Sequence, residues 1–307
     1  MSEKKISKLK LKDQGDIETG ITGLKVYTLE TDKHKTFAYI EPGIYKLTGN
    51  YTQSGIKYMV SEMEIVSDKI LDLPSKEYVT VTRQIGEFLK SETRAKYKEL
   101  DYVYKRSILL YGRPGTGKTC LINRIAADIV KVGGLVLFAD YPSTLSILDT
   151  MFCVQNQNSL AAVILEEFDK HMRSNGAELL TLLDGQIQRD NTMYLCTTNY
   201  IEKIPARILR PGRINIKIEV QYPDIEARLF YLMSKIKDIQ VVNNIAEKTE
   251  GLSIDELKEV VQCVLILNED LDATIDAMHK LNVQIRLDEL NKKDEVPGIL
   301  SMLRGSF

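Results

Sequence analysis

The chain has 307 residues, which is enough for one large domain or two smaller ones. Hydrophobic residues make up 44% of the composition, which excludes a globally disordered protein. The 41 basic and 43 acidic residues give a net charge of −2, so composition indicates no general attraction to nucleic acid or to an anionic membrane.

The cysteines and the apolar segments narrow the class of protein further. The four cysteines lie far apart and form no Cys-x-x-Cys pair, which argues against a zinc site or a disulfide framework and suits a reducing compartment. No apolar run approaches the roughly 18–20 residues that a membrane span needs. The N-terminus also lacks the apolar stretch of a secretion signal. We therefore expect a cytoplasmic protein without a membrane segment.

Two segments precede the first clear helix. Residues 1–15 predict a flexible tail whose lysines are solvated, although an electrostatic contact with DNA, RNA or a protein remains open. Residues 16–73 predict a small N-terminal β module that includes Leu24–Leu29 and Lys35–Ile40, with glycine and proline turns after them. A module of about 58 residues is marginally stable alone, so we expect it to lean on the next domain or on a neighbouring subunit.

Residues 74–222 alternate predicted helices with short apolar strands. This alternation is typical of an α/β domain, in which helices cover both faces of a parallel sheet. The expected strands are Ser107–Tyr111, Leu135–Ala139, Ala161–Leu165, Met193–Thr197 and Ile214–Val220. The expected helices are one that includes Val79, Ile85, Phe88 and Leu89, and then Cys120–Val130, Thr144–Val154 and Ala177–Leu183.

The remaining segments change character. Residues 223–283 have helical periodicity and no strand pattern. Ser253 and Glu256 form the sequence pattern of a capping box, which predicts that a helix begins after Ser253. Residues 284–307 lose the apolar pattern, and we expect a tail or a docking segment there.

The strongest chemical signal is the segment Gly112–Thr119, which matches the pattern G-x-x-x-x-G-K-[ST] between a predicted strand and a predicted helix. Glycines allow the backbone amides of such a loop to turn toward phosphates, and the helix N-terminus adds positive potential. Lys118 is expected to reach the β- and γ-phosphates, and Thr119 to bind Mg²⁺. We expect ATP to be bound by Gly112, Pro114, Gly115, Thr116, Gly117, Lys118, Thr119 and Cys120.

Acidic residues follow another apolar strand. Glu166 and Glu167 come directly after Ala161–Leu165, at the strand end where ligands bind in open α/β sheets. One carboxylate could organise Mg²⁺ and the other could orient and deprotonate an attacking water. Acids at a strand end are also common in solvated loops, so it is the P-loop about 47 residues earlier that favours the functional interpretation.

Two weaker signals complete the set. Asn199 closes the expected strand Met193–Thr197 and could hydrogen-bond the attacking water or the γ-phosphate, although Asn is also a common turn former. Arg207, Arg210 and Arg213 are spaced three apart, which is typical of a surface ion-pair face. Beside the other motifs they become candidates for arginine fingers, which neutralise charge on the γ-phosphate.

These motifs, in this order, resemble the AAA subgroup of the AAA+ ATPases from about Pro74 to Leu281. Further similar segments are Tyr104–Tyr111 before the P-loop, Leu179–Gly185, Ile208–Arg213, Tyr222–Arg228 and Glu250–Ser253. The resemblance implies an αβα core with a five-stranded parallel sheet, a C-terminal helical lid and assembly as a homo-oligomer, usually a hexamer. The compact plan of one short β module and one ATPase domain is similar to AAA ATPases of phages and mobile elements.

The resemblance also implies residue roles. Glu166 occupies the Walker B position that holds Mg²⁺, and Glu167 the position of the catalytic glutamate. Asn199 matches sensor 1. Arg210 and Arg213 match fingers that reach into a neighbour's site, so ATP would lie between subunits.

Three departures from the family pattern limit what the resemblance implies. Glu166 replaces the usual Asp, and its extra methylene could slow turnover. Pro205 and Arg207 break the usual Asp-Pro-Ala run before the fingers. Threading members have an aromatic–hydrophobic–Gly pore loop, whereas Ala139–Leu160 has no glycine.

Three functions therefore stay open. The first is Mg²⁺-dependent ATP hydrolysis by an oligomer that remodels or assembles a protein partner. The second is an ATP-gated assembly switch or scaffold with little turnover. The third, a DNA-acting loader, has only the basic tail in its favour.

Overall fold

The structure is a computed structural model that describes residues 26–29, 40–52, 55–64, 73–139, 159–184 and 190–294. The chain divides into two compact units. The first contains residues 1–72 and 76–221, and the second contains residues 73–75 and 222–307. The expected tail 1–15 and the expected helix Thr144–Val154 lie outside the described residues, as do residues 35–39 of an expected strand.

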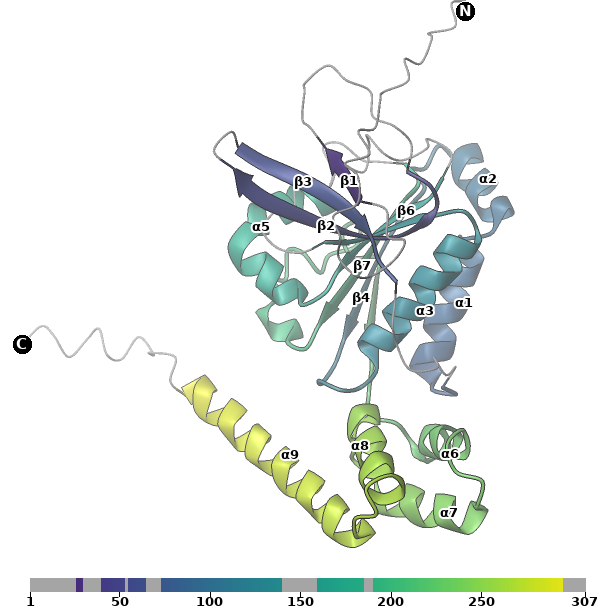
Figure 1. The fold of residues 1–307 in the computed structure, drawn as a ribbon. Coiled ribbons are helices and arrows are strands. Elements are labelled where there is room, and N and C mark those ends of the chain that lie inside the picture. The colour runs from purple at the N-terminus through teal and green to yellow at the C-terminus, as the bar shows by residue number, and fades with distance from the viewer. Residues whose placement is uncertain are drawn as a thin grey trace, which may run out of the picture. The chain divides into compact units, whose positions relative to one another are not determined.

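The first unit is built on one sheet (Figure 1). The strand order of this sheet is β1-β3-β2-β5-β6-β7-β4-β8. Its strands are β1 (Val26–Leu29), β2 (Gly43–Thr52), β3 (Gly55–Glu62), β4 (Lys105–Tyr111), β5 (Leu135–Ala139), β6 (Ala161–Leu165), β7 (Thr192–Thr198) and β8 (Ile216–Glu219). Neighbouring strands from β2 to β8 are parallel, whereas β3 runs antiparallel to both β2 and β1. The five expected strands form the continuous part β5-β6-β7-β4-β8.

Strands from the N-terminal β-rich segment extend this sheet beyond the five expected strands. Residues 43–47 of β2 pair in parallel with residues 135–139 of β5. Tyr45 and Leu47 are buried, with 1% and 0% of their surface exposed. Pairing with β2 satisfies the backbone groups along one side of β5, where an unpaired edge would otherwise remain. The β-rich character was predicted from the sequence, but β2 and β5 are too far apart in the chain for a local pattern to reveal their pairing.

Helices cover both faces of the sheet. The helices on one face are α1 (Lys76–Phe88) and α3 (Lys118–Lys131), and α5 (Phe168–Asp184) covers the other. Along β4, Leu109 packs toward the α5 face while Ile108 and Leu110 pack toward the face of α1 and α3. This alternation follows from the two-residue period of a strand, and it explains why consecutive residues in the middle of β4 are apolar.

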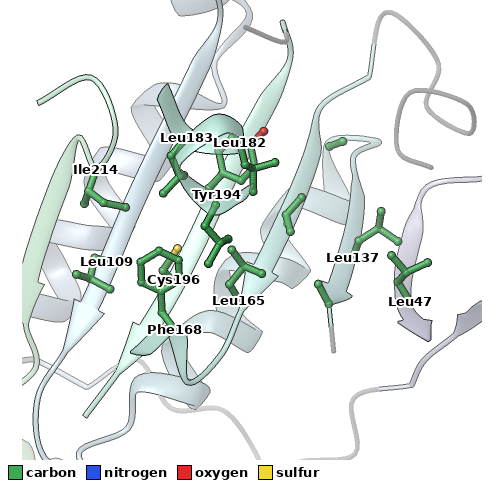
Figure 2. Packing of buried hydrophobic residues seen from close by; sticks show 14 of the residues in the cluster. Leu47, Leu109, Leu137, Leu165, Phe168, Leu182, Leu183, Tyr194, Cys196 and Ile214 are labelled. Atoms are coloured by element: carbon green, nitrogen blue, oxygen red, sulfur yellow. The ribbon is translucent and has the colours of Figure 1, made fainter. Parts of the chain in front are cut away.

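Figure 2 shows the core on the α5 face. Phe168, Leu182 and Leu183 of α5 lie over the side chains of the central strands, among them Leu165 and Cys196. Phe168, Leu183 and Cys196 have no exposed surface. Because Phe168 directly follows Glu167, this packing fixes where the helix begins after the acidic turn.

Two helices differ from the sequence prediction. α5 begins at Phe168, well before the expected start at Ala177. The sequence pattern did not reveal this earlier start because apolar residues are sparse between the two positions. α2 (Ser91–Glu99) was not expected, since most of its residues are polar and none of them is buried. A helix without an apolar face has no periodicity for a pattern to detect.

The second unit is helical, as expected. Its helices are α6 (Ile225–Met233), α7 (Ile239–Lys248), α8 (Ile254–Leu265) and α9 (Leu271–Asp294). The predicted capping box is confirmed, because Ser253 accepts from the amide of Glu256 while the Glu256 carboxylate accepts from the amide of Ser253. α9 continues past residue 283, where the apolar pattern ended, because good helix formers can extend a helix without an apolar face. Among the described residues, no helix is long and apolar enough to cross a membrane.

Candidate active site

The glycine-rich segment forms a tight loop between β4 and α3. The φ angles of Gly112, Gly115 and Gly117 are +147°, +76° and +92°, in the region that favours glycine. A Cβ atom on Gly112 would lie 2.2 Å from the carbonyl oxygen of Val220. Gly117 lies directly before the first residue of α3. The loop therefore exposes backbone amides at a helix N-terminus, which is an anion-binding arrangement.

Lys118 is held inside this loop. Its ammonium donates hydrogen bonds to the carbonyl oxygens of Gly112 and Arg113, at 2.8 and 2.6 Å. The Thr116 hydroxyl also donates to the Arg113 carbonyl, at 2.9 Å. Lys118 and Thr116 are buried, whereas Pro114, Thr119 and Cys120 are exposed at the mouth of the loop. A positive charge thus lies under the site where an anion would bind.

The first acidic residue after β6 reaches the P-loop. The Thr119 hydroxyl donates a hydrogen bond of 2.9 Å to Oε1 of Glu166. A hydroxyl and a carboxylate oxygen that converge in this way are hard donors of the kind that Mg²⁺ prefers. Thr119 and Glu166 therefore fit the magnesium ion that the sequence pattern implied.

Glu167 lies on the turn that joins β6 to α5. Its φ angle is +50°, which is unusual for a residue with a side chain. The Glu167 carboxylate is exposed and forms an ion pair of 2.6 Å with Lys170. A left-handed residue at such a turn costs roughly 1–3 kcal/mol, and here it directs a carboxylate away from the buried sheet.

The end of β7 adds a polar cluster. Thr198, the last residue of β7, donates its hydroxyl to Oδ1 of Asp169 at 2.7 Å. Asn199 follows and is half-buried. The backbone amide of Gly112 donates to the carbonyl oxygen of Thr198 at 3.3 Å. The P-loop, the acidic turn and Asn199 therefore meet at the carboxyl ends of the adjacent strands β4, β6 and β7.

No role was expected for Thr198 or Asp169, although each lies within two residues of a candidate site residue. The available signal was their position, since Thr198 directly precedes Asn199 and Asp169 comes two residues after Glu167.

The arginines lie elsewhere on the first unit. The guanidinium of Arg213 donates to the carbonyl oxygen of Arg207, and the carbonyl oxygen of Arg213 accepts from the Ser107 hydroxyl near the start of β4. Ser107 is about 16 Å from Gly112 along the strand, at roughly 3.3 Å per residue. Arg210 is exposed, and among the described residues its side chain has no ion pair. The structure thus does not bring Arg213 to the P-loop of the same chain.

A parallel sheet with a phosphate-binding loop after one strand and acidic residues after another defines a P-loop nucleoside triphosphatase domain. Comparison with known proteins narrows the class. Residues 108–222 match the ATPase family associated with various cellular activities (AAA). The chain therefore has an AAA domain and is related to the AAA-type ATPases.

Several curated proteins are similar over a longer stretch. A 26S proteasome regulatory subunit 4 homolog of Encephalitozoon cuniculi is 27% identical, over 76% of this chain and 58% of the relative. The proteasome-activating nucleotidase of Saccharolobus solfataricus is 25% identical, over 61% of this chain and 56% of the relative. The ATP-dependent zinc metalloprotease FtsH of Marinobacter nauticus is 29% identical, over 58% of this chain and 32% of the relative. The chain thus spans between about a third and three fifths of these relatives.

Proposed function

We propose that this protein hydrolyses ATP with Mg²⁺ as a homo-oligomer, and that it uses the hydrolysis to act on a protein partner. The observation that carries the proposal is the hydrogen bond between Thr119 and Glu166, beside the buried Lys118 and the exposed Glu167. It joins the phosphate loop to the acidic turn, and these are the two parts that phosphoryl transfer requires.

Binding is proposed to use the loop and its lysine. Backbone amides of the P-loop and the N-terminus of α3 bind the phosphates of ATP. Lys118 then exchanges the carbonyl oxygens of Gly112 and Arg113 for phosphate oxygens. Thr119 and Glu166 would hold Mg²⁺, which when bound supplies positive charge against the phosphate oxygens.

The proposed chemistry uses the two residues on the neighbouring strand ends. Glu167 accepts the proton of the attacking water, and Asn199 orients that water or the γ-phosphate. The exposed position of Glu167 supports this role, because its carboxylate lies on the surface rather than in the core. Lys170 would have to release Glu167 in the reacting site.

The arginine fingers are proposed to come from a neighbouring subunit. Arg213 is fixed near the start of β4, whereas the P-loop follows its end. Because Arg210 is exposed, it can approach a second copy of the chain. Arg213 stabilises the turn that carries Arg210, because its guanidinium donates to the carbonyl oxygen of Arg207. Hydrolysis would then require an oligomer, for which we propose a hexamer.

A protein partner is supported by the relatives. They are named as proteasome regulatory subunits, a proteasome-activating nucleotidase and a protease. Each of these names refers to a proteasome or to a protease, and both act on proteins.

A mixing experiment tests the proposal, with phosphate release as the measurement. Lys118→Ala removes a binding residue but leaves the arginines intact, and Arg210→Ala does the reverse. We expect each variant alone to be inactive and an equimolar mixture to recover part of the activity. In a mixed oligomer, an Arg210→Ala subunit keeps its own Lys118 and can receive Arg210 from a neighbouring Lys118→Ala subunit, so that interface is complete. Wild-type activity should also rise with protein concentration. A mixture as inactive as its components would contradict a shared site.

A second candidate is an ATP-gated assembly switch with little turnover. The ion pair between Glu167 and Lys170 favours it, since the Glu167 carboxylate has to leave this partner before it can contact an attacking water. Glu166 in place of the usual Asp favours it as well. The switch predicts a change of oligomeric state between ATP and ADP, measured by light scattering, together with phosphate release that Glu167→Gln does not reduce.

A further inference from the structure

Thr198 connects three parts of the site through separate atoms. Its carbonyl oxygen accepts the amide of Gly112 at 3.3 Å, which connects it to the P-loop. Its hydroxyl donates to Oδ1 of Asp169 at 2.7 Å, which connects it to the start of α5. The same hydroxyl oxygen accepts the amide of Tyr200 at 3.0 Å. Since a hydroxyl has one proton, the amide of Tyr200 and the carboxylate of Asp169 together fix its direction.

These hydrogen bonds lie next to Glu167 and Asn199, the two residues that are proposed to contact the attacking water. Asn199 lies between Thr198 and Tyr200, so the hydroxyl fixes the backbone on both sides of it. Asp169 lies two residues after Glu167 and only 5% of its side chain is exposed. The buried hydrogen bond between Thr198 and Asp169 therefore connects the segment that contains Glu167 to the segment that contains Asn199.

Packing alone does not require this pair. Thr198 is 1% exposed, and valine has a similar shape without the hydroxyl, so filling space does not by itself require a polar side chain there. Burying a carboxylate is costly unless it is hydrogen-bonded or paired. Asp169 is compensated by Thr198, by the N-terminus of α5 and by a distant contact of 3.5 Å with Arg173, whose side chain is 64% exposed. A role in positioning the neighbouring residues explains why the Thr198 hydroxyl and the Asp169 carboxylate are buried despite this cost.

We propose that Thr198 and Asp169 are positioning residues, which hold Glu167 and Asn199 at a fixed separation so that both contact the same attacking water. This inference rests on the proposed ATP hydrolysis. The pair acts on the rate of the chemical step and contributes nothing to nucleotide affinity, because the two side chains bond each other, Tyr200 and Arg173 rather than a P-loop residue. A displacement of about 1 Å in such a site costs up to about 100-fold in rate.

The test compares Thr198→Val with Thr198→Ser. Valine removes the hydroxyl at constant shape, and we expect the kcat for phosphate release to fall roughly 10- to 100-fold while the Kd for Mg·ATP changes less than about twofold. Serine keeps the hydroxyl and should restore most of the rate. Hydrogen exchange provides a second readout, since the amide of Tyr200 should exchange faster in the valine variant than in the serine variant.

Asp169→Asn and Asp169→Ala guard against a folding defect. Asparagine keeps an acceptor oxygen for Thr198 and should keep more activity than alanine. A purely structural pair would lower the melting temperature and nucleotide affinity together, which would overturn the inference. Wild-type kcat in Thr198→Val, or no rescue by serine, would also overturn it. If the wild-type protein itself releases no phosphate, the proposed function fails first and this inference fails with it.

Discussion

At the scale of single residues, backbone conformation limits the loop more than side-chain chemistry does. Gly112 combines a φ of +147° with a close approach to Val220, and each of these alone disfavours a side chain. Its backbone carbonyl also accepts from Lys118. The first glycine of the motif is therefore required by the fold of this chain, in addition to the phosphate binding that we propose.

Gly112→Ala is expected to abolish ATP binding and to lower the free energy of unfolding. The new Cβ would lie 2.2 Å from a backbone oxygen, so the loop or the segment after β8 must shift. Gly86→Ala is the matched control, because its Cβ meets nothing within 4 Å in the interior of α1. The control should stabilise the protein by about 0.5–1 kcal/mol. Calorimetry with and without ATP measures both effects, and equal behaviour of the two variants would contradict this account.

The cysteines should differ sharply in reactivity. Burial raises the pKa of Cys263 to about 11, and it raises the pKa of the fully buried Cys196 further. A raised pKa keeps a thiol protonated, so neither forms its nucleophilic thiolate at pH 8. Cys120 is exposed beside the P-loop. We expect a thiol reagent at pH 8 to modify Cys120 and to leave Cys196 and Cys263 unmodified until denaturant is added, as peptide mass spectrometry would detect.

At the scale of elements, aromatic packing joins α1, α2 and the start of β4. The Phe88 and Tyr104 rings stack with centroids 4.2 Å apart, and the Tyr97 ring meets both rings edge-on. The Tyr104 hydroxyl donates to the carbonyl oxygen of Phe88 at the end of α1. The ring contacts of Tyr97 help explain why a polar helix such as α2 forms in this position, since they pack one of its side chains against Phe88 of α1 and against Tyr104.

Tyr104 should make stability depend on pH in the alkaline range. Burial raises the pKa of Tyr104 to about 12, above the value near 10 of an unfolded tyrosine. The folded state then binds the proton more tightly, so this contribution is complete below pH 10 and is lost as pH rises toward 12. We expect the stability difference between wild type and Tyr104→Phe to shrink from pH 9 to pH 11, measured by urea unfolding. A constant difference would contradict the assignment.

At the scale of the whole molecule, the N-terminal strands are part of the sheet of the first unit. β2 pairs with β5 along Gly43–Leu47, and Leu47 contributes to the same core as Leu137 and Leu165. The expected β module therefore shares its core with the rest of the first unit. A disturbance in β2 should be felt throughout that unit.

Leu47→Ala is expected to lower the free energy of unfolding of the nucleotide-binding unit by about 2–5 kcal/mol. Leu47 is fully buried, and truncation leaves a cavity in the shared core. Leu100→Ala is the same chemical change at a residue that is 63% exposed, and it should change stability by less than about 0.5 kcal/mol. Thermal unfolding with ATP present compares the two variants. An unchanged melting temperature in Leu47→Ala would mean that β2 folds independently.

The sequence alone determined the parts of this protein that are contiguous in the chain. The P-loop between β4 and α3, the acids after β6 and the capping box of α8 are short patterns whose geometry depends on neighbouring residues. Only the tertiary structure decided which distant segments meet. The pairing of β2 with β5, the contacts of Thr198 with Gly112 and Asp169, and the separation of Arg213 from the P-loop all follow from strand order. Strand order depends on the packing of the whole core, so no local pattern records it.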